Sequence, residues 1–163
     1  MKKSTRLLAT GFNVVLVTPE IPQNTGNIAR LCACTGSNLH LIKPMGFSLE
    51  DRYLRRAGLD YWDRVNVKVY DSFESLKRRY PQGRFILTST HAPRNLFQFR
   101  FQPHDFFVFG KESSGLPRHW IDSNPQLAIS IPILPETRSL NLANSVAIVL
   151  FEAIRQLQLY TVP

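Results

Sequence analysis

The stretch that decides the fold reads Asn13-Val14-Val15-Leu16-Val17-Thr18, and a loop and a helix-like segment follow it. A short run that is apolar at nearly every position is typical of a strand buried on both faces of a parallel sheet. Pro19 and Pro22 mark the loop, and residues 25–35 have the composition of a helix that Gly36 ends. This stretch therefore predicts one strand–loop–helix unit of an α/β protein.

Strand-like and helix-like segments continue to alternate along the chain. Further strands are expected at 39–42, 65–70, 84–90, 105–109 and 126–131, and further helices at 48–57, 71–79 and 141–159. Ser48 and Asp71 are the expected N-caps of the first two of these helices, and Glu74 would complete a capping box. The alternation predicts an α/β class with a mainly parallel sheet and helices on both faces. We expect residues 1–12 to form a flexible N-terminal arm and residues 13–163 a single domain.

The charge of the chain is strongly basic and unevenly distributed. Lys+Arg is 20 and Asp+Glu is 12, which gives a net charge of +8 over 163 residues. This excess favours a polyanionic partner, either a nucleic acid or an anionic membrane. Residues 51–100 hold 11 basic and 5 acidic groups, whereas residues 101–163 hold 4 and 5. Arg52, Arg55 and Arg56 share one helical face, which is either a solvated surface or part of a phosphate-binding surface.

The same sequence argues against several classes of protein. No apolar run approaches the roughly 20 residues that a membrane-spanning helix needs, and Leu7-Leu8-Ala9 is too short for the core of a signal peptide. Cys32 and Cys34 fit neither a redox pair nor a zinc site, and no metal-ligand spacing stands out elsewhere. We therefore expect a cytoplasmic protein without a membrane segment or a bound metal.

The predicted helix at 141–159 is apolar on nearly every side. Its apolar positions are Leu142, Ala143, Val146, Ala147, Val149, Leu150, Phe151, Ile154 and Leu157. In a chain of this size one sheet covers only one face of such a helix. We expect the other face to form a subunit interface, most simply in a two-fold dimer, with coverage by the chain's own loops as the alternative.

Three polar loops follow predicted strands, where open α/β sheets place their ligand sites. They are Pro22-Gln23-Asn24-Thr25-Gly26-Asn27-Ile28-Ala29-Arg30, Phe109-Gly110-Lys111-Glu112-Ser113-Ser114-Gly115-Leu116-Pro117, and the segment from Ile131-Pro132 to Ser139-Leu140-Asn141 and Ser145. Asn24, Asn27 and Arg30 are spaced by three, which suits a ribose-phosphate, although a helix cap and a surface charge are the alternative. The second loop lacks the P-loop pattern, and no strand is followed by a G-x-G-x-x-G turn.

Taken together, these loops resemble the three motifs of the SPOUT methyltransferases. The first loop matches N-x-G-N-x-x-R, the second F-G-x-E-x-x-G-L-P and the third I-P-x…S-L-N-x-x-x-S, in that order along the chain. The stretches Pro44-Met45-Gly46-Phe47 and Leu54-Arg55-Arg56-Ala57-Gly58-Leu59-Asp60-Tyr61 look most like the small TrmL, or YibK-like, branch. Enzymes of this branch 2'-O-methylate the wobble nucleotide of tRNA.

The resemblance implies a fold, a reaction and a set of site residues. The implied fold has a deep C-terminal trefoil knot, and the implied enzyme is a homodimer through the helix at 141–159. It uses S-adenosylmethionine to methylate the ribose of nucleotide 34, a cytidine or a modified uridine, in tRNA. The positions carried over are Arg30, Asn24 and Glu112 for catalysis and Leu87, Gly110, Ile131, Ser139 and Asn141 for the cofactor, while Arg52, Arg55 and Arg56 are the expected RNA contacts.

Arg30 has two alternative roles in such a reaction, as a base or as an electrostatic stabiliser. Because guanidinium groups stay protonated in proteins, we expect Arg30 to stabilise negative charge on the 2'-oxygen or to hold a phosphate. Phe151 stands where some relatives carry Tyr, so any role of that hydroxyl must be filled differently here. The alternatives to this function are methylation of another tRNA or rRNA site and a non-catalytic RNA-binding module.

Overall fold

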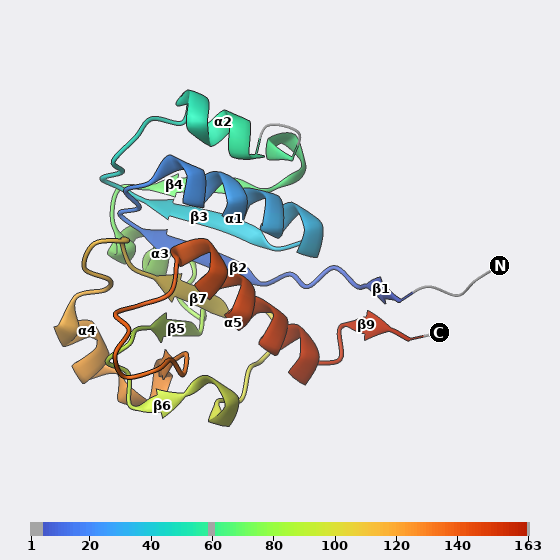
Figure 1. Ribbon diagram of the computed structural model, residues 1–163. Helices are drawn as coiled ribbons and strands as arrows, with labels where there is room; N and C mark the ends of the chain where they lie inside the picture. Colours follow the sequence, from blue (N-terminus) through green and yellow to red (C-terminus); the bar gives the residue numbers. More distant parts are fainter. Residues whose placement is uncertain (1–4, 59–60, 163) are drawn as a thin grey trace.

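A seven-stranded sheet forms the centre of the computed structural model, which describes residues 5–58 and 61–162 (Figure 1). Its order is β4-β3-β2-β7-β5-β8-β6, and the paired strands run parallel. The strands are β2 (Asn13–Val17), β3 (Asn38–Ile42), β4 (Val67–Tyr70), β5 (Phe85–Thr88), β6 (Arg94–Asn95), β7 (Phe106–Phe109) and β8 (Ala128–Ser130). The predicted α/β class with a mainly parallel sheet is confirmed.

Helices cover both faces of this sheet (Figure 1). One face carries α1 (Pro22–Thr35) and α5 (Leu142–Gln156), with α2 (Arg52–Gly58) packed against α1, and the other carries α3 (Phe73–Arg79) and α4 (Arg118–Ser123). Short 3-10 turns lie at Trp62–Arg64 (η1), Leu96–Gln98 (η2) and Pro125–Leu127 (η3). None of the helices in the described ranges is long and apolar enough to cross a membrane.

The apolar run in β2 is explained by this layering. Val14 and Leu16 belong to the core beneath α1 and α5, whereas Val15 and Val17 belong to the core beneath α3 and α4. Successive side chains of a strand point to opposite faces, so a strand covered on both faces needs apolar residues at every position.

The helix boundaries differ from the predicted ones where local caps compete. α1 begins at Pro22 rather than at residue 25, because proline is well tolerated in the first turn, where its missing N–H costs no helical hydrogen bond. α2 begins at Arg52 rather than at Ser48, since the Asp51 carboxylate accepts the Tyr53 N–H at 2.7 Å. α5 ends at Gln156, three residues before the predicted end.

The predicted N-cap and capping box of α3 were also wrong. Ser72, not Asp71, is the N-cap, and it forms the capping box with Ser75 rather than with Glu74. Asp71 instead pairs with Lys43 at 3.1 Å across the neighbouring strand ends. Adjacent acidic and hydroxyl residues are both good caps, so the sequence alone does not distinguish them.

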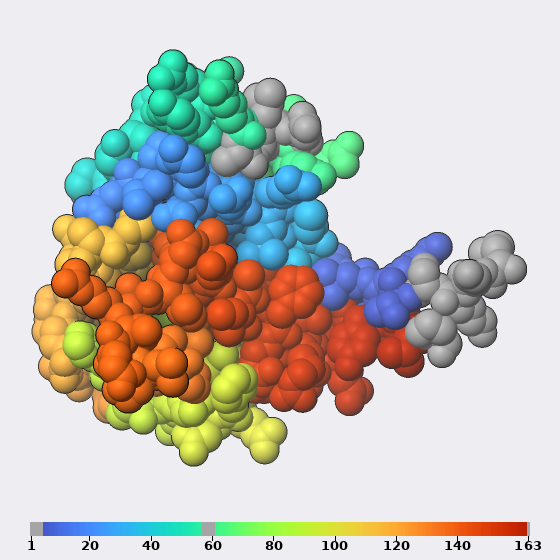
Figure 2. Space-filling view, viewed as in Figure 1, coloured from blue at the N-terminus to red at the C-terminus, as the bar shows by residue number. Residues whose placement is uncertain are grey.

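The two ends of the described chain meet in a small ribbon that projects from the rounded body (Figure 2). β1 (Arg6–Leu7) pairs antiparallel with β9 (Tyr160–Thr161). Phe12 is fully buried and belongs to the central core, so it is part of the folded body rather than of an arm. The first four residues of the predicted arm lie outside the described residues.

His40 is a buried, neutral histidine in β3. Its Nε2 lies 3.0 Å from Asn13 Oδ1, which can only accept, so this ring nitrogen carries the proton. Burial, together with the charge of Lys68, lowers the pKa of His40 from 6.5 to about 4. Between these two values the unfolded chain binds more protons than the folded protein, so stability rises with pH in this window.

We therefore expect the free energy of unfolding to fall by about 2 kcal/mol between pH 7 and pH 5 because of His40 alone. Urea unfolding of the protein and of His40→Gln at both pH values measures this contribution. It is the change in unfolding free energy between the two pH values in the parent minus the same change in the variant. The exposed His91 provides a matched substitution, and His91→Gln is measured under the same conditions. Equal pH dependence in His40→Gln and the parent would contradict the assignment.

Candidate active site

The three motif loops leave the same edge of the sheet, formed by the carboxyl ends of its strands (Figure 1). The first motif lies in the opening turns of α1, directly after the connection from β2, whereas the second loop follows β7 and the third lies between β8 and α5. β2, β7, β5 and β8 are consecutive in the sheet order, so the loops are neighbours in space although they are distant in sequence. The three motif segments therefore lie at one edge of the sheet.

Glu112 ties the second loop to the first. Its Oε2 accepts the N–H of Glu20 at 2.8 Å, and its Oε1 accepts the N–H of Ile21 at 3.1 Å and the Nδ2 of Asn24 at 3.2 Å. Both carboxylate oxygens thus accept hydrogen bonds from the β2–α1 connection and the first turn of α1. This arrangement suits a residue that positions the site, and it leaves little capacity for proton transfer.

Asn24 and Asn141 extend this link to the third loop. Asn141 Nδ2 donates to Asn24 Oδ1 at 3.0 Å, and Asn141 Oδ1 accepts the N–H of Asn144 at 3.2 Å as the N-cap of α5. The hydrogen-bonded series Glu112–Asn24–Asn141 therefore connects all three loops. Asn141 is therefore the N-cap of α5 as well as a link between the loops.

Glu20 forms a second link that the sequence analysis missed. Its carboxylate accepts the N–H and the hydroxyl of Ser113, both at 2.9 Å. These hydrogen bonds, with the charge of Lys111, lower the pKa of Glu20. The only signal in the sequence was that Glu20 stands two residues before the first motif.

Gly110 allows the second loop to double back on itself. A Cβ at this position would overlap the backbone of Gly115 and Leu116, and the Gly115 N–H donates to the Lys111 carbonyl at 2.9 Å. Gly115 itself has a φ of +68°, with open space where its side chain would be. The first glycine is therefore required by a close approach and the second by its backbone conformation.

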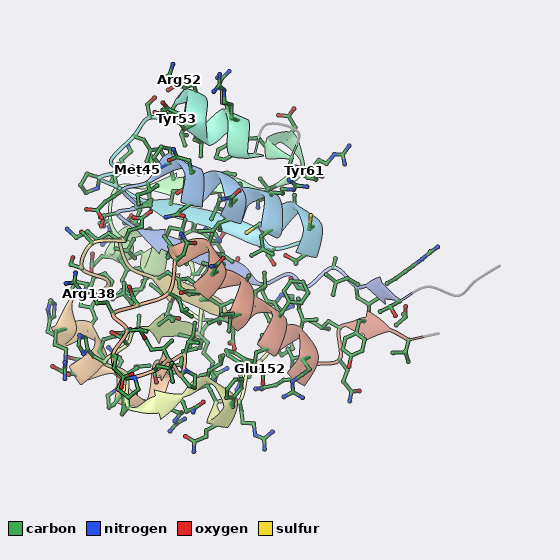
Figure 3. The ribbon with its side chains drawn as sticks, in the orientation of Figure 1. Met45, Arg52, Tyr53, Tyr61, Arg138 and Glu152 are labelled. Atoms are coloured by element: carbon green, nitrogen blue, oxygen red, sulfur yellow. The ribbon has the colours of Figure 1, made fainter. Side chains whose placement is uncertain are left out.

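The residues carried over for the cofactor meet at adjoining strand ends. Leu87 lies in β5 and Gly110 directly follows β7, which pairs with β5, while Ile131 directly follows β8 on the other side of β5. Ser139 lies on the exposed third loop, which Arg138 marks in Figure 3. The buried Thr88 Oγ1 at the end of β5 has no hydrogen-bond partner among the described residues. An unpaired hydroxyl beside a glycine-lined backbone fits a small polar ligand such as S-adenosylmethionine.

Arg30 stands apart from this hydrogen-bonded chain. It is an exposed residue of α1, and its guanidinium carbon lies 4.9 Å from the centre of the Tyr61 ring. Figure 3 shows Tyr61 beside α1, away from the loop that carries Arg138. The ring holds the guanidinium by a cation–π contact and leaves its N–H groups available. Tyr61 was not predicted as a site residue, although it ends the Leu54–Tyr61 stretch that resembles the YibK-like branch.

The three arginines of the predicted RNA-binding face lie on α2 and are all exposed. Arg52 lies over the Tyr53 ring at 4.8 Å and donates to its hydroxyl at 2.8 Å. Both residues stand at the outer end of α2 in Figure 3. Arg55 and Arg56 belong to the last turn of the same helix. This combination of cations and an aromatic ring suits the backbone and bases of RNA.

Metal chemistry has no visible basis in the described part of the chain. No group of three or more His, Cys, Asp or Glu side chains there could hold a metal ion. Cys32 is buried, which raises the pKa of its thiol, and Cys34 is exposed.

A parallel α/β sheet with three linked ligand loops at its carboxyl edge defines a methyltransferase of the SPOUT type, as the sequence motifs implied. The chain belongs to the SpoU rRNA Methylase family, whose model matches residues 11–151.

Two relatives of known name are similar over nearly their whole length. The tRNA (cytidine(34)-2'-O)-methyltransferase of Burkholderia pseudomallei is 49% identical over 150 residues, which cover 89% of this chain and 95% of the relative. The protein of the same name from Methylovorus glucosotrophus is 47% identical over 146 residues, with coverage of 89% and 95%.

Solved structures give the same result for the fold. A structure that concerns the 2-OH methylation of C/U34 on tRNA matches with a TM-score of 0.86 at 43% identity, covering 90% of this chain and 96% of that one. The SpoU methyltransferase AviRb from Streptomyces viridochromogenes, in complex with AdoMet, matches with a TM-score of 0.78 at 24% identity, with coverage of 94% and 60%. The second likeness bears on the fold alone.

Proposed function

We propose that this protein transfers the methyl group of S-adenosylmethionine to the ribose 2'-oxygen of nucleotide 34, a cytidine or a modified uridine, in tRNA. The observation that carries the proposal is its 47–49% identity, over almost the full length, to tRNA (cytidine(34)-2'-O)-methyltransferases. The three linked motif loops at the carboxyl edge of the sheet support the same function.

Leu87, Gly110, Ile131, Ser139 and Asn141 are the proposed cofactor-binding positions. When bound there, S-adenosylmethionine supplies a methyl group on a positively charged sulfur. Gly110 lets the second loop double back against Gly115 and Leu116, and Asn141 fixes the third loop through Asn24. The unpaired Thr88 hydroxyl at the same edge supports a polar ligand in this position.

Arg30 is the proposed catalytic residue, and Asn24 and Glu112 join the first motif to the other two loops. A 2'-hydroxyl is a poor nucleophile unless its O–H bond weakens as the oxygen attacks the methyl carbon. Negative charge develops on the oxygen as the proton leaves, and it is neutralised as the O–C bond forms and the S–C bond breaks. The exposed guanidinium of Arg30 can donate a hydrogen bond to that oxygen, or two parallel hydrogen bonds to the oxygens of an adjacent phosphate. The hydroxyl proton leaves to solvent or to a phosphate of the RNA.

Arg52, Arg55 and Arg56 are the proposed contacts to the tRNA backbone. Replacing all three by alanine should weaken tRNA binding and should make its dependence on salt concentration less steep. Each lost phosphate contact should reduce the slope of log K against log salt by roughly 0.7–0.9. Filter binding at four salt concentrations measures this slope, and an unchanged slope would contradict the assignment.

The outer face of α5 supports the homodimer. Ile148 and Phe151 are 38% and 51% exposed on a helix whose opposite side is fully buried. A second copy of the chain packed on this face would cover them, which sedimentation equilibrium can test. We place the protein in the cytoplasm, where its tRNA substrate is found.

A map of ribose methylation in tRNA from cells that lack the protein tests the proposed substrate. The methyl group at nucleotide 34 should disappear from some tRNAs and return when the gene is restored. Unchanged methylation at this nucleotide would reject the proposal. Calorimetry with S-adenosylmethionine separates the enzyme from the RNA-binding module, which would bind RNA and no cofactor.

A further inference from the structure

A cavity of about 690 Å³ opens beside the second motif loop on the face of the sheet that α3 and α4 cover. Its floor is apolar and includes Val17 and Ile42 at the ends of β2 and β3. It has room for a whole nucleotide. None of the five proposed cofactor positions lines this cavity, but Lys111, the neighbour of Gly110, does.

The cavity lies where the topology of the sheet favours a ligand. β2 has β3 on one side and β7 on the other, and the chain crosses β2 to build the second half of the sheet. In open α/β sheets, ligands bind outside the carboxyl ends of the strands at such a switch point. The cavity is lined from both sides of this point, by Lys43 after β3 and by Lys111 after β7.

The lining suits a flat aromatic group that carries a negative charge. The rings of Phe73 and Trp120 stack at a centroid distance of 4.6 Å and an interplanar angle of 23°, and both border the cavity. Lys43, Lys111 and Arg118 also border it, together with the acidic Asp71 and Glu74, so the cations exceed the carboxylates by one. Arg118 is paired with Asp122 at 3.0 Å. Lys43 is paired with Asp71 at 3.1 Å, but its side chain is 54% exposed and remains accessible to an anion. Stacking on an aromatic ring beside cations is how proteins hold unpaired nucleotides.

We propose that this cavity binds a nucleotide of the RNA substrate other than the one that is methylated. Its base lies against Trp120, and its phosphate lies near Lys43 and Lys111. This proposal rests on the proposed function, because it assumes that the polyanion is RNA. The loop from Gly110 to Pro117 then contacts the cofactor at one end and the RNA strand at the other, which couples recognition of the strand to the site of transfer.

The first test fills the cavity without changing charge. Ser114 is an exposed residue of its lining, and Ser114→Phe should raise the KM for tRNA roughly tenfold or more, the value expected for the loss of one stacked base. The affinity for S-adenosylmethionine should stay unchanged. The matched control is Ser123→Phe on the exposed side of α4, outside this cavity, which should leave both values unchanged. Equal effects of the two variants would overturn the proposal.

The second test does not depend on catalysis. The chain has 2 tryptophans, so Trp62→Phe leaves Trp120 as the only one. An RNA hairpin with the sequence of a substrate anticodon arm should quench Trp120 fluorescence, and Ser114→Phe should abolish the quenching. A protein that bound this RNA without transferring methyl groups would keep the quenching, so failure of the proposed function is distinguishable. If free adenosine monophosphate quenched Trp120 and the RNA hairpin could not displace this nucleotide, the proposal would be overturned.

Discussion

Replacing Arg30 by alanine is expected to lower kcat about 100- to 1000-fold while leaving the affinity for S-adenosylmethionine unchanged. The guanidinium is exposed and stacks on Tyr61, outside the hydrogen-bonded chain that joins the motif loops. Its loss therefore removes a donor for the developing charge on the 2'-oxygen and leaves the loops intact. Single-turnover methyl transfer measures the rate, and calorimetry measures the affinity.

Two further variants separate charge from geometry at this position. Arg30→Lys keeps the positive charge but loses the planar fork, so an intermediate rate is expected. Tyr61→Phe keeps the ring beneath the guanidinium and should be nearly as active as the parent. A wild-type rate in Arg30→Lys would refute the role of the fork.

Gly110→Ala is expected to abolish cofactor binding and to lower the free energy of unfolding by about 1–3 kcal/mol or more. The new methyl group would overlap the backbone of Gly115 and Leu116, and neither can move without opening the second loop. Because Glu112 lies in that loop, its hydrogen bonds to the first loop would be lost with it. Thermal unfolding with and without S-adenosylmethionine measures both effects.

Gly115→Ala is the matched control for this variant. Its side chain would meet open space, and the cost arises only from the φ of +68°. A single residue in this conformation costs about 1–2 kcal/mol. Cofactor binding should therefore persist in Gly115→Ala. If S-adenosylmethionine raised the unfolding temperature of Gly110→Ala as much as that of the parent, the close approach at Gly110 would be contradicted.

The sequence predicted those parts of the fold that depend on local patterns. The apolar run in β2 indicated burial on both faces, and the order of strands and helices indicated a parallel sheet. It failed where two good caps stand side by side. Asp71 and Ser72 are equivalent by propensity, and the structure makes Ser72 the N-cap, with Ser75 completing the capping box, while Asp71 pairs with Lys43. Such a choice depends on contacts across strands, which a local pattern does not contain.

The site was predicted as a set of residues but not as a network. Motif resemblance singled out Asn24, Glu112 and Asn141 separately, whereas the structure joins them through hydrogen bonds that span more than 80 residues of sequence. Glu20 and Tyr61 were missed because neither lies inside a motif loop. The roles of the individual site residues, the trefoil knot and the homodimer stay predictions.

Transfer of a labelled methyl group from S-adenosylmethionine to purified tRNA tests the central claim most directly. The decisive substrate pair is a tRNA with ribose at nucleotide 34 and the same tRNA with 2'-deoxyribose at that nucleotide alone. We expect one methyl group per molecule on the first tRNA and none on the second. Equal labelling of both would contradict methylation of the ribose of nucleotide 34. The same conclusion would follow if the enzyme failed to label a tRNA that was isolated from knockout cells and lacks this methyl group.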